Sequence, residues 1–379
     1  MFAVHNNYNY MKHFFYFVLF LFIITGCKQK KEQTTTGNNP VAEETVKTIT
    51  PLTQGEVFYK NKEPFGDIIN LTGQQLIADT VIFKPREIQM LVKGNCLIVK
   101  NFGYNVFMRF LLPEMKFLGF SGRQGQGPDE FIYPSLVPAT DTTILCYLFE
   151  HTNQKLYKFG KAGTIERDSF RLSKAGQNGY SDKAIVNIAP DDFLYVESNN
   201  TGKSIYRTKK TGDSIAVREI YKLGLSSNLK SGFTYIGDFV VNAKLNRMAY
   251  AYKYFKIIKF MDLEAQTVKT INFERGEFDE GSLHIANGLD QNVTHYWGAC
   301  AGDDYVYFLY SGRTPVEVGR ENNKGQHYIY VEQYDWNGNP VHKYKLDRWG
   351  YFTVDEKNKL IYLVSTNDDD PFFTFQLAN

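Results

Sequence analysis

The chain has 379 residues and a formal net charge of +2, with 43 basic and 41 acidic side chains. This balance offers no electrostatic basis for binding nucleic acid, which proteins hold through a strongly basic surface. Tyr and Phe are abundant, with 26 and 30 residues, and such a composition favours strands over helices.

The first segment of the chain is typical of a secretory signal. Lys12 and His13 precede an almost unbroken apolar run from Phe14 to Ile24. A spanning helix needs roughly 20 apolar residues, so this shorter run fits the apolar region of a signal peptide instead. We therefore predict a signal peptide over residues 1–26, with Met11 as an alternative start.

The residue that follows the predicted signal is a candidate for lipidation. The stretch from Ile24 to Cys27 resembles the lipobox of bacterial lipoproteins, in which an aliphatic residue and two small residues precede the cysteine. The resemblance implies cleavage before Cys27 and attachment of lipid, including palmitate, to this residue. Gln29 in place of Asp favours the outer membrane of a Gram-negative envelope, and its basic neighbours favour the periplasmic side. The alternative is a plain signal peptide with an unrelated cysteine.

A polar segment separates this cysteine from the rest of the chain. Residues Lys28 to Pro51 are rich in Thr and nearly free of aromatic side chains. Such a segment cannot bury enough apolar surface to offset the entropy of ordering it. We predict a lipidated, flexible tether over residues 27–65 and a folded body over residues 66–379.

Six similar strands recur along the predicted body. Each consists of a turn-forming cluster followed by an alternating apolar strand. Equivalent positions recur about every 50 residues, and several short strands per repeat indicate a β-propeller rather than a helical solenoid. We predict an all-β fold, a six-bladed β-propeller with four-stranded antiparallel blades. The six segments are Lys93–Lys100, Thr140–Phe149, Pro190–Ser198, Lys244–Tyr252, Gly302–Tyr310 and Glu356–Val364.

The two ends of the body are predicted to close the ring together. After Trp349 there is room for three strands, near Tyr351–Val354, Leu360–Ser365 and Phe372–Leu377. The stretch Leu76–Lys84 is a spare strand ahead of the first repeat. Pairing this N-terminal strand as the outer strand of the last blade closes the ring and protects an exposed edge.

Several sequence segments of the predicted body resemble those of a known family. Phe120–Phe131, with its repeated glycines, resembles the inter-blade segment of NHL-type propellers. Tyr310–Glu317 and Tyr330–Asp347, together with the final DDDPFFTFQL, look like the TolB-like six-bladed propeller lipoproteins. The resemblance covers the chain from about Gly66 onwards. It implies a propeller and an envelope lipoprotein, but no reaction.

Charged residues on two loops are the candidate ligand-binding residues. The Gly-rich segment lacks the helix that must follow a phosphate-binding loop, so turn formation is the expected role of its glycines. Arg123, Asp129 and Glu130 nevertheless place charge on a loop near one face of the ring, where propellers usually bind ligands. Arg313 is a second charge of this kind.

The remaining cysteines and two of the tryptophans each allow two interpretations. Cys96, Cys146 and Cys300 lie within apolar runs and are expected to be buried, with a disulfide between Cys96 and Cys146 left open. No CxxC or His-rich spacing suggests zinc. Trp297 and Trp336 are candidate platforms for sugar rings, against the alternative that they pack between blades.

A metal-dependent hydrolase of the lactonase kind is the alternative function. Such an enzyme would hold calcium or zinc through polar side chains that converge from the inner strands into the central channel. The expected inner strands offer Glu87, Asn187, Asp238 and His295. Chance supplies such a set easily, and neither a GxSxG nor an HExxH motif occurs, so no catalytic residue is assigned.

The function that the sequence favours is a non-catalytic binding platform in the cell envelope. Its expected partners are the membrane, through the lipid on Cys27, and another envelope protein or a glycan. No cofactor other than that lipid is expected, and whether any catalysis occurs is left open, with a non-enzyme favoured.

Overall fold

The computed structural model describes residues 50–60, 63–76, 87–127, 130–168, 170, 172, 184–199, 202–226, 232–273 and 292–378. The chain divides into residues 1–48 and a second unit, Ile49–Asn379, and every described residue belongs to the second unit. The predicted signal peptide and Cys27 lie outside the described residues. Across the described ranges, no helix is both long and apolar enough to cross a membrane.

The second unit consists of six β-sheets, which we number as blades 1–6 in chain order. In each of blades 1–5, four consecutive strands form an antiparallel meander. Blade 1 contains β4 (Gln89–Lys93), β5 (Cys96–Lys100), β6 (Asn105–Leu111), β7 (Lys116–Gln124) and β8 (Glu130–Phe131), the last of them parallel to β7. Blade 2 contains β9 (Pro134–Val137), β10 (Ile144–Glu150), β11 (Lys155–Gly160) and β12 (Ile165–Arg167). Blade 3 contains β13 (Ile185–Ala189), β14 (Asp192–Asn199), β15 (Gly202–Thr211) and β16 (Ser214–Lys222).

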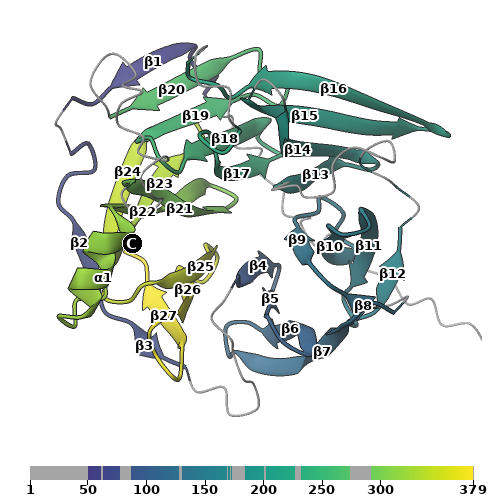
Figure 1. Cartoon of the computed structure of the whole chain (residues 1–379), viewed down its shortest axis with the longest axis horizontal. Coiled ribbons are helices and arrows are strands. Elements are labelled where there is room, and N and C mark those ends of the chain that lie inside the picture. The colour runs from purple at the N-terminus through teal and green to yellow at the C-terminus, as the bar shows by residue number, and fades with distance from the viewer. Residues whose placement is uncertain are drawn as a thin grey trace, which may run out of the picture. The chain divides into compact units, whose positions relative to one another are not determined.

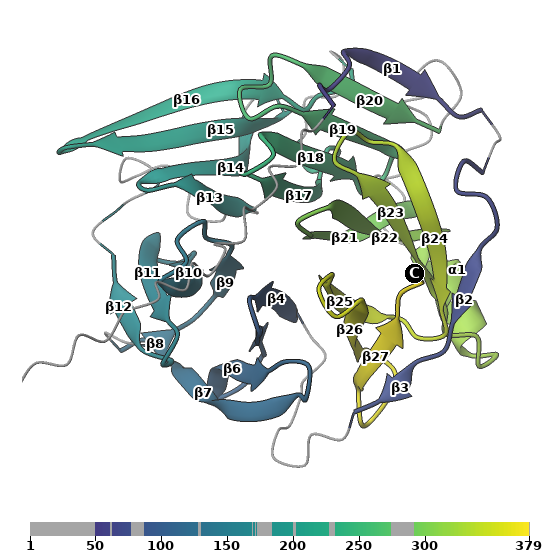
Figure 2. The same cartoon turned by 180° about the vertical axis from the view of Figure 1, so that it is seen from behind.

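The other three blades repeat this arrangement around the same centre. Blade 4 contains β17 (Gly237–Asn242), β18 (Arg247–Tyr252), β19 (Ile257–Met261) and β20 (Val268–Asn272). Blade 5 contains β21 (Thr294–Ala301), β22 (Tyr305–Arg313), β23 (Ile329–Asp335) and β24 (Pro340–Leu346). Blade 6 contains β25 (Gly350–Asp355), β26 (Leu360–Ser365) and β27 (Phe372–Gln376). Figures 1 and 2 show the first strand of every blade at the centre of the ring. The prediction of a six-bladed β-propeller is confirmed.

The six strand segments singled out in the sequence are the second strands of the six blades, β5, β10, β14, β18, β22 and β26. Their central residues are buried, as at Leu97, Leu194 and Ile361. A second strand has a neighbouring blade against each of its two faces, so both faces need apolar side chains. This two-sided burial is why these strands were the clearest signal in the sequence.

The N-terminal part of the described chain adds one strand to each of three successive blades, a feature we call the N-terminal belt (residues 55–60 and 63–75). β1 (Gly55–Phe58) pairs in parallel with β20, and β2 (Ile69–Leu71) pairs in parallel with β24. β3 (Gln74–Gln75) then pairs antiparallel with β27 as the outer strand of blade 6. The belt strands lie on the outer rim in Figure 1. Blades 4 and 5 therefore have five strands rather than the predicted four.

The belt confirms that an N-terminal strand closes the ring, but the residues that pair differ from those predicted. The ring is closed by an N-terminal strand on the last blade, but the paired residues are Gln74 and Gln75, just ahead of the predicted Leu76–Lys84. Leu76 continues the contact by donating its backbone N–H to the carbonyl oxygen of Phe372, at 2.8 Å. The rest of the predicted strand, from residue 77, lies outside the described residues.

Part of the segment predicted as a flexible tether, residues 27–65, belongs to the belt. Residues 55–58 are hydrogen-bonded in blade 4, and the Phe65 side chain is buried against Tyr334 with 5.1 Å between ring centroids. Belt strands cover a sheet edge while their outer side remains exposed, so their sequence lacks the apolar alternation of an inner strand. This is why the polar composition suggested a tether.

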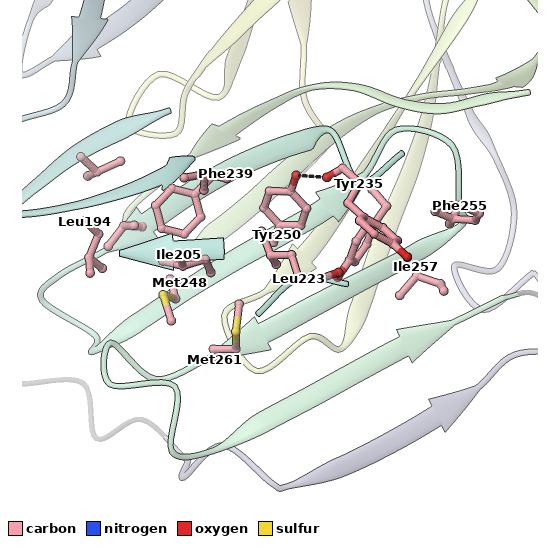
Figure 3. Close-up of a cluster of buried hydrophobic side chains, with 14 of the residues drawn as sticks. Leu194, Ile205, Leu223, Tyr235, Phe239, Met248, Tyr250, Phe255, Ile257 and Met261 are labelled. Carbon is pink, nitrogen blue, oxygen red and sulfur yellow. Dashed lines mark hydrogen bonds between the residues drawn. The ribbon is translucent and has the colours of Figure 1, made fainter. Parts of the chain in front are cut away.

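Aromatic side chains pack the blades against each other, as the cluster between blades 3 and 4 illustrates (Figure 3). Leu194 and Ile205 of blade 3 meet Phe239 and Met248 of blade 4 in this cluster. The Tyr250 hydroxyl donates to the Tyr235 carbonyl oxygen at 2.5 Å. Such a ring fills space between blades while its hydroxyl satisfies a buried loop carbonyl.

The cysteines beyond Cys27 are free thiols, so no Cys96–Cys146 disulfide is present. Cys96 and Cys146 are buried in the cluster between blades 1 and 2, as predicted. Cys300 is only half-buried, and its sulfur accepts the backbone N–H of Val354 at 3.3 Å.

Candidate functional site

One face of the ring collects most of the candidate residues. In a propeller blade the loops between second and third strands emerge at the same end as the connections to the next blade, because consecutive strands run antiparallel. We call this end the upper face. It carries the loop after β5, the Gly-rich loop after β7, the loop after β18 and the long connection after β22.

The Gly-rich loop is packed around one of the predicted binding residues. Glu130 accepts a hydrogen bond from the backbone N–H of Gly127 at 2.9 Å, and a Cβ at Gly125 would collide with its carboxylate. Gly122 has φ +68°, a conformation that favours glycine, as the turn interpretation requires. Arg123 is exposed, with its Cζ 5.8 Å from the Tyr104 ring centroid, and Asp129 lies outside the described residues.

A shallow depression, partly open to solvent, lies beside this loop between blades 1 and 2. Its lining includes Glu87, Lys100, Gln124 and Tyr133. Lys100 is only 5% exposed, and its Nζ lies 5.5 Å from the Tyr133 ring centroid. Burial lowers the pKa of Lys100, while Glu87 and Glu150 act in the opposite direction.

The inner-strand candidates do not share one location. Asp238 and His295 are the second residues of β17 and β21, and Glu87 lies just before β4, so all three belong to the upper end of their strands. Asn187 lies near the hairpin at the other end of β13. Its amide donates to the Ala189 and Asp192 carbonyl oxygens at 2.6 and 3.1 Å.

The protonation behaviour of these residues follows from their burial. Burial raises the pKa of Asp238 to about 6, although Lys253 and Lys203 favour the carboxylate. Burial and the nearby Lys256 lower the pKa of His295 to about 3. Within the described part of the chain, no group of three or more His, Cys, Asp or Glu side chains is arranged to hold a metal ion. The four candidates are therefore not gathered into one ligand set there.

Arg313 anchors a helix rather than facing solvent. It forms an ion pair with Glu321 of α1 (Pro315–Asn322) and donates to the Tyr328 carbonyl oxygen at 2.7 Å. Its Cζ lies 4.0 Å from the Tyr328 ring centroid. Thr314 and Glu317 close the start of this helix with a capping box. The guanidinium is thus committed to holding the connection between β22 and β23.

Arg313 is also part of a series of cationic and aromatic side chains that crosses the upper face, which we call the cation–aromatic row. The Lys253 Nζ lies 4.6 Å from the Trp297 ring centroid, and Trp297 and Trp349 have their centroids 6.2 Å apart. The Arg313 Cζ lies 5.6 Å from the Trp349 ring centroid. The row consists of Phe233, Tyr254, Lys253, Trp297, Trp349, Arg313, Tyr328 and Lys345.

The two tryptophans that the sequence singled out have different environments. Trp297 is 37% exposed on the upper part of β21, whereas Trp336 is only 2% exposed and donates its Nε1–H to the Gly302 carbonyl oxygen at 3.2 Å. Trp336 therefore packs the fold, and Trp297 is accessible to a ligand. Sequence reasoning missed Lys253 and Trp349, although the run YAYKYFK already interleaves cations and aromatic residues at the end of a second strand.

A buried charge network lies within blade 5 and reaches the belt. Lys343 lies 2.8 Å from Glu63 of the belt and 3.3 Å from Glu332, which is fully buried. The hydroxyls of Tyr296 and Tyr334 donate to the same Glu332 carboxylate, at 3.2 and 3.1 Å. Burial alone would lower the pKa of Lys343, but the two carboxylates raise it above its ordinary value. The network thus joins the belt to blade 5.

The fold and this surface define a six-bladed β-propeller with an upper face rich in cations and aromatic rings. The family model for the TolB-like 6-blade propeller-like proteins matches residues 64–357, so the chain belongs to this family, as the sequence resemblance implied. Comparison with curated proteins gives no significant match.

Two solved structures from Bacteroides share the architecture. A member of the DUF4221 family from Bacteroides vulgatus is 11% identical, with a TM-score of 0.54, over 81% of this chain and 95% of that chain. A Bacteroides fragilis protein described as exported is 12% identical, with a TM-score of 0.50, over 86% of this chain and 99% of that chain. At these identities the likeness shows the fold alone.

Proposed function

We propose that the protein is a lipid-anchored envelope protein whose propeller binds an anionic ligand, a glycan or a segment of another envelope protein, without transforming it. The cation–aromatic row carries this proposal. Trp297 offers an exposed ring, and Lys253 places a cation over that ring. Within the described part of the chain, Asp238 acts on the charge of Lys253 without forming a close ion pair with it. Exposed aromatic rings and flanking cations are typical of binding surfaces.

The placement of the row supports a platform rather than a catalytic centre. Its members come from blades 4 and 5 and from the connections that lead into blades 4 and 6, so blade packing holds them in place. Such pre-organisation lowers the entropy cost of binding. The metal-dependent hydrolase has no comparable support, because its candidate ligands are spread over both ends of the blades.

The envelope location rests on the sequence. The apolar run from Phe14 to Ile24 favours export, and the lipobox-like stretch that ends at Cys27 favours lipid attachment. Gln29 favours the outer membrane. The Bacteroides fragilis structure described as exported supports export of a chain with this fold. A lipid on Cys27 would keep the platform at the membrane while the polar tether gives it reach.

The test is binding of the full-length chain, solubilised in detergent, to arrayed envelope glycans and purified envelope proteins. Trp297→Ala and Lys253→Met should each weaken capture of an anionic ligand at least tenfold. Lys244→Met removes an exposed lysine from the hairpin at the opposite end of blade 4 and serves as the matched control. The bound ligand should be recovered intact by mass spectrometry. Equal capture by all variants, or cleavage of the ligand, would reject the proposal.

A further inference from the structure

We infer that Trp297 and Lys253 form a subsite for an acidic sugar, with the pyranose ring against the indole and the sugar carboxylate on the ammonium. This inference rests on the proposed function, because it assigns a ligand class to the same surface. It concerns one sugar unit of a glycan that carries uronic acids.

The indole supplies the platform. Trp297 is exposed on β21, and Trp349 stands beside it with an angle of 54° between the ring planes. Two inclined rings bound an angled apolar surface on the upper face. The axial C–H groups of a pyranose are weakly positive, and the face of an aromatic ring is weakly negative, so the two surfaces attract. Burial of the sugar's apolar face adds to this attraction.

The ammonium supplies the charge. Lys253 follows β18 directly, and its carbonyl oxygen accepts the backbone N–H of His295 at 2.7 Å, which ties the loop to blade 5. Among the described residues, its Nζ has no hydrogen-bond acceptor or ion-pair partner within bonding distance. Its close neighbours are the rings of Tyr254 and Trp297, and the carboxylate of Asp238 acts on its charge from farther away. An ammonium that is partly withdrawn from water gains more from an anionic ligand than a fully hydrated one.

The spacing favours a uronic acid over an acidic peptide. The Nζ lies 4.6 Å from the centre of the indole, so charge and platform are within one sugar ring of each other. A uronic acid carries its carboxylate directly on the pyranose, with a flat C–H face and a charge in fixed relation. A peptide carboxylate is on a flexible side chain without such a face, and ordering it costs conformational entropy.

The row contains a second candidate cation for the sugar carboxylate, Arg313. Arg313 lies farther along the row, but its guanidinium already binds Glu321 and the Tyr328 carbonyl oxygen. Its place in the row is therefore to support Trp349 and Tyr328. Lys253 is the cation expected to make the ion pair with the sugar.

Calorimetry with the full-length chain tests the inference. The probes are tetramers of galacturonate, glucuronate and mannuronate, methyl-esterified tetragalacturonate, and a glutamate peptide of equal charge. We expect at least one uronate to bind, and at least tenfold weaker binding of the ester, which keeps the ring and removes the charge. Lys253→Met should lose tenfold in affinity for the uronate and little for the ester. Trp297→Ala should weaken both, and Lys244→Met neither.

The outcomes separate the inference from the proposed function. Equal affinity for acid and ester, preference for the glutamate peptide, or no binding of any uronate at millimolar concentration would overturn the acidic-sugar subsite. If another ligand still depends on Trp297, the binding platform stands. If a ligand binds and neither Trp297→Ala nor Lys253→Met changes its affinity, both proposals fail.

Discussion

The Nζ of Lys253 lies 4.6 Å from the centroid of the Trp297 ring, although Lys253 belongs to blade 4 and Trp297 to the inner strand of blade 5. The two are joined through the hydrogen bond between the Lys253 carbonyl oxygen and the His295 N–H. The relative position of cation and ring is therefore set by the packing of two blades. A disturbance of that packing should alter the binding surface as well as the stability of the ring.

Removal of the buried cation Lys343 should be strongly destabilising. In Lys343→Met, Glu332 would remain fully buried, with the two tyrosine hydroxyls as hydrogen-bond donors and Lys256 as a more distant cation. Breaking such a buried pair costs about 3–5 kcal/mol, and we expect the lower part of this range in chemical denaturation. Glu63→Gln is the control. Because Glu63 is partly exposed, this replacement should lower the free energy of unfolding by less than about 1 kcal/mol. Similar effects of both changes would contradict the network.

The belt should stabilise the ring through Phe65. Phe65 is 7% exposed and packs edge-on against Tyr334, whereas Phe58 of β1 is 39% exposed. Phe65→Ala removes a buried ring and leaves a cavity, so we expect a loss of about 3–4 kcal/mol in the free energy of unfolding. Phe58→Ala should cost less than about 1 kcal/mol. Equal urea midpoints for the two variants would show that the belt adds little.

We expect Arg313 to stabilise α1 rather than to bind a charged ligand. Lysine cannot reproduce the two-sided contact of the guanidinium with Glu321 and the Tyr328 carbonyl oxygen. In Arg313→Lys, amide hydrogen exchange of α1 should therefore accelerate about tenfold. Arg320→Lys, on the exposed side of the same helix, is the control and should leave exchange unchanged. Unchanged exchange in Arg313→Lys would refute the anchoring role.

Asp238 should titrate near pH 6, because its pKa lies well above the ordinary value of an aspartate. Its pKa is raised from 3.8 to about 6, chiefly by burial, with Lys253 and Lys203 opposing the shift. An acid with a raised pKa in the folded state opposes folding once it ionises, so this penalty develops as pH rises from about 4 to about 6. In carbon NMR of labelled aspartates, one carboxyl should titrate near pH 6 and disappear in Asp238→Asn. Asp238→Asn should be more stable than the native chain at pH 7.5, with the difference shrinking towards pH 4. A midpoint near 4 would refute the burial of this carboxyl.

The parts of the fold that were predictable are those buried on two sides. Segments such as Lys93–Lys100 and Gly302–Tyr310 contain second strands, and their apolar runs recur because every blade needs the same packing. The belt was not predictable from the same signal. β3 consists of Gln74 and Gln75, which contribute backbone hydrogen bonds to the edge of blade 6 without burying apolar side chains.

The candidate site was predictable only in part. Trp297 and Arg313 were named from the sequence, and both belong to the row, but Lys253 and Trp349 were missed. Glu87, Asp238 and His295 share an end of the blades, whereas Asn187 lies at the other end. Lipidation at Cys27 and a binding role for Asp129 stay predictions.

The sequence by itself determined the number of blades and the identity of their second strands. Burial between blades requires an apolar strand in every blade, so the apolar pattern recurs along the chain and can be recognised there. Only the tertiary structure decided which side chains share a surface. The cation–aromatic row brings together residues as far apart as Phe233 and Trp349, and the belt runs from blade 4 to blade 6. Neither follows a period in the sequence, because each depends on how separate blades and loops meet in space.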